Sequence, residues 1–260
     1  MEIVFLIIAV TASVVGAMSG IGGGVIIKPV MDALQVMDIS SINFLSGGTV
    51  LSMAAYSFFK NRKNVIELNY KVTVFLTIGA SLGGIAGKSI FGYIHSGLAA
   101  IQSAKLLIIN VLVLLYILKK EKMVSLKITN HCVCLSMGFV LGAVSSFLGI
   151  GGGPMNIAVL YYFFSMTPKE AAKNSLFIIL FSQITSLCTT LITRTVPPFD
   201  VITMVVMCTG GIIGAEIGSY FSKRMDNNAL ERFFLIVLYI IIFINMYNFF
   251  QSVRPWIAAT

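Results

Sequence analysis

Two glycine clusters inside apolar sequence are the first candidates for chemistry. The sequence Gly-Ile-Gly-Gly-Gly occurs at residues 20–24 and again at 149–153. Consecutive glycines weaken a helix by about 1 kcal/mol each relative to alanine, so each cluster predicts an interrupted helix. The N–H groups that begin the next helix would then have no acceptor in their own helix, and such groups attract anions. The clusters therefore indicate a pair of anion-binding backbone segments.

A second interpretation of the same glycines is close packing between helices, because small residues let two backbones touch. Pro154 favours the interrupted helix, because it directly follows the second cluster and suits the first turn of a helix. Backbone in contact with lipid must stay hydrogen-bonded. Each interruption must therefore face protein or a water-filled cavity.

Few ionisable side chains accompany the glycines. Lys28 follows Gly24 by four residues, where its charge would strengthen an anion site, although a lysine can also extend to the membrane surface. In the second half, Asn156 is the only polar side chain at the corresponding place. Glu216 lies late in an apolar segment, where charged residues are functional candidates. It could exchange protons and couple transport to them, or it could pair with a basic residue.

Asparagines recur at matching places. Asn43 and Asn174 are separated by 131 residues, and Ser175 follows the second of them. These residues either line one site together or serve as helix caps and interhelical hydrogen bonds, and the sequence leaves both interpretations open. His95 and His131 have no third metal ligand nearby, and no catalytic arrangement is visible. We therefore expect no metal, no cofactor and no enzyme activity.

The elements that position these residues are apolar helices. Of the 260 residues, 57% are hydrophobic and only 11% are charged, and the mean hydropathy is +0.94. A soluble domain averages about 25% charged residues, whereas a membrane-spanning helix needs about 20 apolar residues. The chain is therefore predicted to be an all-α polytopic integral membrane protein. The expected segments are 3–19, 24–37, 40–59, 67–90, 98–118, 132–149, 153–165, 170–193, 200–221 and 230–251.

The repeated glycines divide the chain into two halves. A basic linker at 121–129 separates a first repeat at 1–120 from a second at 130–260. Another glycine series, with members four residues apart, also recurs 131 residues later and is expected to pack helices together. Its members are Gly79, Gly83 and Gly87, and Gly210, Gly214 and Gly218.

Loop charges predict the orientation. Lysine and arginine gather in short loops, which face the cytoplasm in most membrane proteins. Five segments in each half then make the halves antiparallel, an inverted repeat with re-entrant or broken helices at the glycine clusters. The net charge of +8 is explained by this topology, so no nucleic acid partner is expected. The basic loop residues are Lys60, Arg62, Lys63, Lys119, Lys120, Lys122, Lys127, Lys169, Lys223, Arg224 and Arg232.

The twin motif resembles that of the TauE/SafE family of sulfite exporters, also called the toluene-sulfonate uptake permease family. The resemblance rests on residues 20–29 and 149–154 and covers nearly the whole chain. It implies a multi-pass carrier of the bacterial or archaeal inner membrane. It also implies that the two motifs meet and form the substrate site, with Asn43, Asn174 and Ser175 nearby. The glycines carried over by position are Gly22, Gly23, Gly24, Gly151, Gly152 and Gly153.

The expected function is secondary transport of a small anion by alternating access. The resemblance implies sulfite, sulfonates or related organosulfur compounds as substrates, and protons or another ion as the driver. Lys28 departs from the family pattern, where an apolar residue is expected, so the substrate can differ. The alternatives are an ion channel with re-entrant loops and a carrier of a non-sulfur carboxylate. The expected partners are the anion, the coupling ion and the lipid bilayer.

Overall fold

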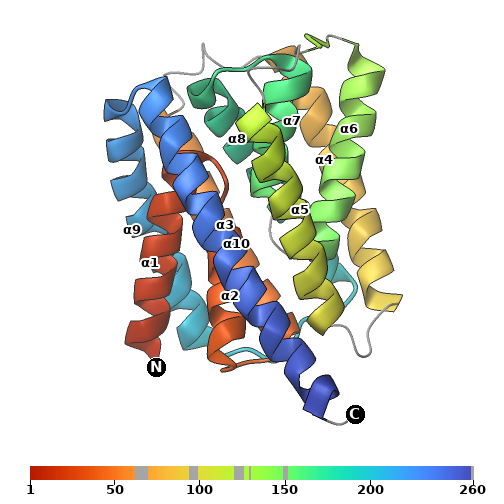
Figure 1. Cartoon of the computed structure of the whole chain (residues 1–260), viewed down its shortest axis with the longest axis vertical. Coiled ribbons are helices and arrows are strands. Elements are labelled where there is room, and N and C mark those ends of the chain that lie inside the picture. Colours follow the sequence, from red (N-terminus) through yellow and green to blue (C-terminus); the bar gives the residue numbers. More distant parts are fainter. Residues whose placement is uncertain (62–69, 94–98, 120–125, 129, 149–151, 259–260) are drawn as a thin grey trace.

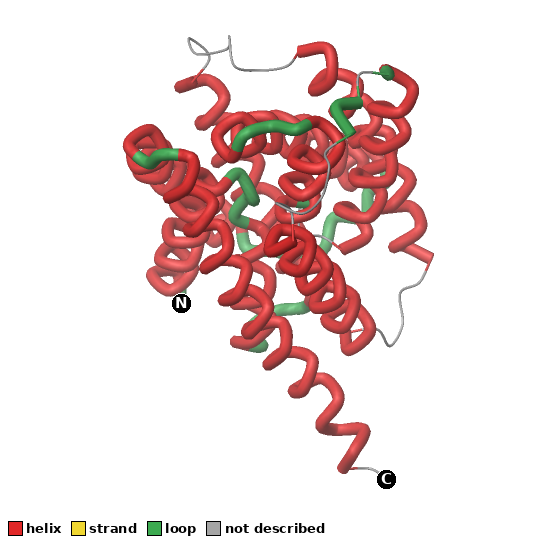
Figure 2. Tube along the Cα trace, turned by 45° about the horizontal axis from the view of Figure 1, so that its top comes forward, coloured by secondary structure: helices red, strands yellow, loops and turns green. Residues whose placement is uncertain are grey.

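The computed structural model describes residues 1–61, 70–93, 99–119, 126–128, 130–148 and 152–258. These residues form helices joined by loops and contain no strand (Figures 1 and 2). Each predicted apolar segment coincides with one helix, so the predicted all-α class is confirmed. The helices are α1 (Glu2–Ser19), α2 (Gly24–Leu34), α3 (Ile39–Asn61), α4 (Tyr70–Tyr93), α5 (Ala99–Lys119), α6 (His131–Leu148), α7 (Gly153–Phe164), α8 (Pro168–Ile192), α9 (Val201–Arg224) and α10 (Asn227–Ala258).

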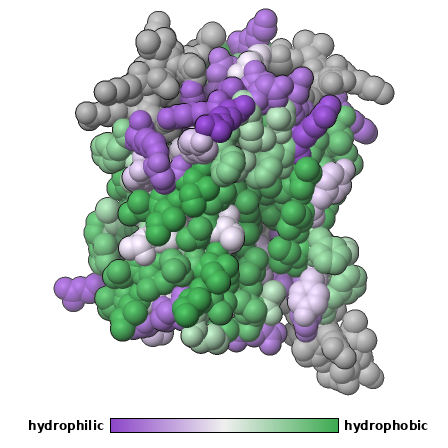
Figure 3. All heavy atoms as spheres, turned by 90° about the vertical axis from the view of Figure 1, so that its left-hand side faces the viewer, coloured by the Kyte–Doolittle hydropathy of each residue, from purple (hydrophilic) through white to green (hydrophobic). Residues whose placement is uncertain are grey.

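The helices have the character of membrane spans. By length and apolar composition, α1, α8, α9 and residues Asn227–Gln251 of α10 can each cross a bilayer. Shorter apolar stretches occupy parts of α4, α5 and α6. On the face that lies to the left in Figure 1, an apolar belt separates two polar rims (Figure 3). The chain is therefore a multi-pass membrane protein.

Contacts between the halves occur in matching pairs. α1 packs along α9, and its counterpart α6 packs along α4; α3 contacts α9 as α8 contacts α4. α3 also contacts α8, and α5 contacts α10. Figure 1 shows that α4 and α9 run in opposite directions, as do α5 and α10. These features accord with the predicted inverted repeat, which stays a prediction.

The glycine series with four-residue spacing packs helices together, as predicted. A Cβ added to Gly79, Gly83 or Gly87 would overlap backbone of α6. On the other side of the bundle, added Cβ atoms on α9 would collide with α1. The backbones therefore touch along both helix pairs. The α9 glycines in these contacts are Gly210, Gly214 and Gly218.

Side-chain caps begin α8 and α9. The Thr167 hydroxyl accepts a hydrogen bond from the Glu170 N–H, and the Glu170 carboxylate accepts one from the Thr167 N–H at 2.8 Å. This reciprocal capping box satisfies two N–H groups at the start of α8. At α9, the Asp200 carboxylate accepts a bond of 2.9 Å from the Thr203 N–H. That hydrogen bond holds the pKa of Asp200 below its usual value.

The two ends of the bundle differ in charge. Helices α3 and α9 finish at one end of the bundle, where α8 and α10 begin. This end of the bundle carries Lys60, Lys169, Lys223 and Arg224. α1 begins and α10 ends at the opposite end (Figure 1). The basic loops named from the sequence that lie within the described residues thus share one side. That this side faces the cytoplasm stays a prediction.

Neighbouring glycines on α4 provide a matched test of the packing. A Cβ at position 83 would overlap the Phe139 carbonyl oxygen, whereas one at position 84 would lie 3.2 Å from the movable Ser146 hydroxyl. Gly83→Ala should lower the free energy of unfolding in detergent by about 1–3 kcal/mol through overpacking. Gly84→Ala should lower it by less. Equal stabilities of the two variants, measured by thermal unfolding, would contradict the close contact of α4 with α6.

Candidate functional site

The first glycine cluster interrupts a helix, as predicted. α1 ends at Ser19, and Gly20 has φ 74° while its N–H donates to the Gly16 carbonyl at 2.9 Å. Gly22 has φ 83°, and α2 begins at Gly24. Both positive φ values lie in the left-handed region that glycine adopts without steric cost. We call residues 20–24 the first glycine break.

The second glycine cluster also precedes a helix. Gly152 has φ 76°, Gly153 begins α7, and Pro154 lies in its first turn. The Asn156 N–H donates to the Gly152 carbonyl at 2.9 Å and so closes that turn. Gly151, which was also predicted to bind substrate, lies outside the described residues. We call Gly152 and Gly153, the described residues of this cluster, the second glycine break.

The two glycine breaks meet. A Cβ added to Gly153 would overlap the carbonyl oxygen of Ile21, so the start of α7 lies against the backbone of the first break. A Cβ on Gly20 would in turn overlap Ala172 of α8. The Ser175 hydroxyl, also on α8, donates to the Gly20 carbonyl at 2.7 Å. The first break is therefore held between α7 and α8, and only glycine fits at these contacts.

Lys28 is buried one helical turn beyond the first break. Its exposed fraction is 1%, and burial of a charge requires an opposite charge or a polar ligand. Asp32 lies one further turn along α2, so the two residues occupy the same face of the helix. Asp32 was not among the residues predicted from the sequence. Its pairing with Lys28 could have been predicted, because the two opposite charges are four residues apart in an apolar segment.

The second break has polar side chains of its own. Asn156 is buried, with 2% of its surface exposed. A Cβ added to Gly152 would lie 3.2 Å from the Asn156 Oδ1 and 2.9 Å from the Ser145 Oγ. Both polar atoms therefore adjoin the break. The structure thus brings Asn156 and Ser175 to the breaks, and it adds Ser145, which the sequence did not single out.

The repeated asparagines differ in their partners. The Asn174 amide donates to the Glu170 carbonyl at 2.7 Å and accepts a hydrogen bond from the Thr73 hydroxyl on α4. Asn174 therefore makes an interhelical hydrogen bond, one of the two roles considered for it. The Oδ1 atom of Asn43 is buried and has no partner among the described residues. Met204 occupies the position equivalent to Thr73, so the second half offers no matching hydroxyl.

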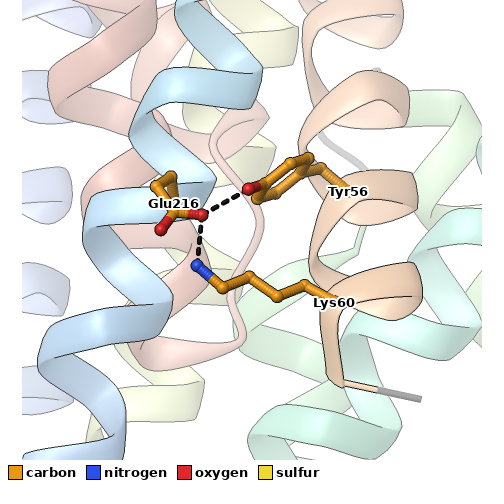
Figure 4. A network of polar contacts seen from close by, with 3 residues as sticks. All are labelled: Tyr56, Lys60 and Glu216. Carbon is orange, nitrogen blue, oxygen red and sulfur yellow. Dashed lines mark hydrogen bonds and ion pairs between the residues drawn. The ribbon is translucent and has the colours of Figure 1, made fainter. Parts of the chain in front are cut away.

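Glu216 joins α9 to the last turns of α3. Its carboxylate accepts a hydrogen bond from the Tyr56 hydroxyl and forms an ion pair with Lys60 (Figure 4). Its side chain is 49% exposed, and that of Lys60 is 30% exposed. Pairing with a basic residue was one of the two roles considered for Glu216. A role in coupling stays a prediction.

Comparison with known proteins points to a transport function. Residues 5–246 match the family model described as "Sulfite exporter TauE/SafE". The chain is 22% identical over 270 residues to the probable membrane transporter protein YunE of Bacillus subtilis (strain 168). That alignment covers 92% of this chain and 95% of the relative. No solved structure matches the chain.

Two serines of α8 test how the first break is held. Ser175→Ala should lower the free energy of unfolding by about 1–3 kcal/mol, because the buried Gly20 carbonyl loses its donor. Ser182→Ala is the matched control: its hydroxyl is also buried but donates to the Ile179 carbonyl of its own helix at 3.1 Å. Thermal unfolding in detergent measures both variants. A loss no greater for Ser175→Ala than for the control would contradict the proposed support of the break.

Proposed function

The chain belongs to the TauE/SafE family of sulfite exporters, and on that premise we propose that it is a secondary transporter of small anions. Its role in membrane transport follows from the family and from the related membrane transporter. The observation that carries the anion proposal is the meeting of the two glycine breaks one turn from the buried Lys28. Both breaks begin helices whose first N–H groups lack an acceptor in their own helix.

The proposed substrate site lies where α2 and α7 begin. Positive ends of the two helix dipoles and the Lys28 ammonium group together favour a negative charge. Asn156, Ser145 and Ser175 adjoin the same breaks. Asp32 partly offsets the charge of Lys28, so the site suits a small anion of low charge. Sulfite, sulfonates and related organosulfur anions are the proposed class, in agreement with the family name.

Alternating access would follow from movement of one half against the other. The paired contacts of α1 with α9 and of α6 with α4 support two related halves. We propose that these halves are inverted repeats, with the basic end of the bundle in the cytoplasm and the protein in the cell inner membrane. In one conformation the glycine breaks would be open to one side of the membrane, and in a second conformation they would be open to the other side.

Transport into proteoliposomes tests this function. Sulfite, sulfonates and carboxylates should be compared, with uptake measured as a function of concentration and with the same anion preloaded inside. A carrier should saturate and should be accelerated by the preloaded anion, whereas a channel should do neither. Saturable uptake of carboxylates alone would exclude the sulfur-anion class, and the absence of uptake of any anion would count against an anion carrier.

Lys28→Gln should weaken anion binding by about tenfold or more, because a charged hydrogen-bond donor is lost. The variant leaves Asp32 without its positive neighbour, so the double variant Lys28→Gln/Asp32→Asn separates this effect from the loss of the donor. The double variant should bind the anion as weakly as the single one. Lys223→Gln, at the exposed end of α9, is the control. Binding by either Lys28 variant that equals the control would remove Lys28 from the site.

Glu216 should be tested as a coupling residue by its effect on pH dependence. If its carboxylate carries the coupling proton, Glu216→Gln should abolish the stimulation of uptake by a pH gradient and should retain counterflow exchange. Lys60→Met is the matched control, because it removes the ion pair and keeps the carboxylate. A pH-gradient response in Glu216→Gln equal to that of the wild type would limit Glu216 to joining α3 and α9.

A further inference from the structure

Asn110 of α5 has a buried side-chain amide that makes no hydrogen bond to any described residue. Its exposed fraction is 1%, and neither its Nδ2 nor its Oδ1 has a hydrogen-bond partner among the described residues. An amide buried in this way costs free energy, because it gives up its hydrogen bonds with water. Buried polar groups that lack a partner therefore require an explanation, and a ligand or a bound water is the usual one.

Other buried asparagines of the bundle donate hydrogen bonds to backbone carbonyls. The Asn245 amide donates to the Ile241 carbonyl at 2.9 Å, one turn earlier in its own helix, and Asn174 does the same with Glu170. Asn248 donates to the Pro29 carbonyl at 2.8 Å. A carbonyl one turn earlier is available to Asn110 as well, but its amide makes no such bond.

The position of Asn110 connects it with the first glycine break. Asn110 shares one face of α5 with Val113, Leu114 and Ile117, which lie one and two turns further along. These three residues belong to the apolar cluster that contains Ile21 of the first break and Val25 of α2. The same cluster includes residues of α7 and α10. Asn110 is thus a buried polar residue on the α5 face that joins this cluster, and α5 also contacts α7, whose start lies against the first break.

We propose that Asn110 contacts the transported anion and selects its protonation state, an inference that rests on the proposed transport of anions. Its Nδ2 would donate to one oxygen of the anion, and its Oδ1 would accept a hydrogen bond from a protonated oxygen. An amide left with both a donor and an acceptor matches an oxyanion that retains one proton. Hydrogen sulfite has this property. A sulfonate, whose oxygens only accept hydrogen bonds, leaves the Oδ1 without a partner.

The test compares two ligands on the purified full-length chain in detergent. Hydrogen sulfite and methanesulfonate carry the same charge, but only the first has a proton to donate. Wild-type protein should bind hydrogen sulfite about tenfold more tightly, the effect of one hydrogen bond within a buried site. Asn110→Leu, a substitution of similar size, should lose this preference. Asn245→Leu is the matched control, because its amide already bonds within α10, and it should keep the preference.

Thermal unfolding without ligand provides the second measurement. Asn110→Leu should unfold at the same temperature as the wild type or at a higher one, because it removes an amide without partners. A wild type that binds hydrogen sulfite and methanesulfonate equally, or an Asn110→Leu variant that keeps the wild-type preference, overturns the inference and leaves anion transport standing. If Asn110→Leu unfolds at a lower temperature and keeps the preference for hydrogen sulfite, the Asn110 amide binds a structural water instead. A wild type that binds no anion overturns the proposed function and this inference together.

Discussion

Hydrogen bonding of the backbone in a medium without water is the constraint on which the structure depends. A helix that stops inside the bundle leaves carbonyl and N–H groups that lipid cannot satisfy. The first glycine break meets this constraint in two ways: the Gly20 N–H donates to Gly16 in the last turn of α1, and the Gly20 carbonyl accepts from Ser175 of the distant helix α8. In the proposed site, unpaired N–H groups at the starts of α2 and α7 would bind the substrate. The break is therefore a costly feature of the fold, and the same exposed N–H groups suit it to the proposed binding of an anion.

Glycine is required in this structure for two physically distinct reasons. At Gly20, Gly22 and Gly152 the backbone has positive φ, and glycine is required by conformation. Along α4 and α9 the glycines have ordinary helical geometry, and they are required because the backbones of α6 and α1 lie against them. The second group supports the first, since α1 ends at one glycine break and α6 leads to the other. Close packing of the outer helices thus fixes where the broken helices meet.

Much of this organisation could be predicted from the sequence, because it depends on local patterns. Apolar runs predicted each helix, and glycine spacing predicted both the packed faces and the interruption after α1. The partners of individual polar residues could not be predicted, because they depend on contacts between distant segments. Thr73 reaches Asn174, and Lys60 reaches Glu216, across more than 100 residues of sequence. That the Asn110 amide has no partner among the described residues is likewise visible only when its surroundings are known.

Polar side chains distinguish the two halves of the chain, whose helices make contacts in matching pairs. The Asn174 Oδ1 has an interhelical partner, whereas the Asn43 Oδ1 has none among the described residues, and Glu216 has Ile85 as its counterpart. Lys28 belongs to the first half, and the corresponding region of the second half offers Asn156. A site between such halves can present backbone N–H groups from both sides, except that Pro154 has none at the position of Val25, and a cation from one side only. An anion bound there would have a fixed orientation, with its charged oxygen toward α2. Similar backbones would then permit the change of access, while unequal side chains would determine what is carried.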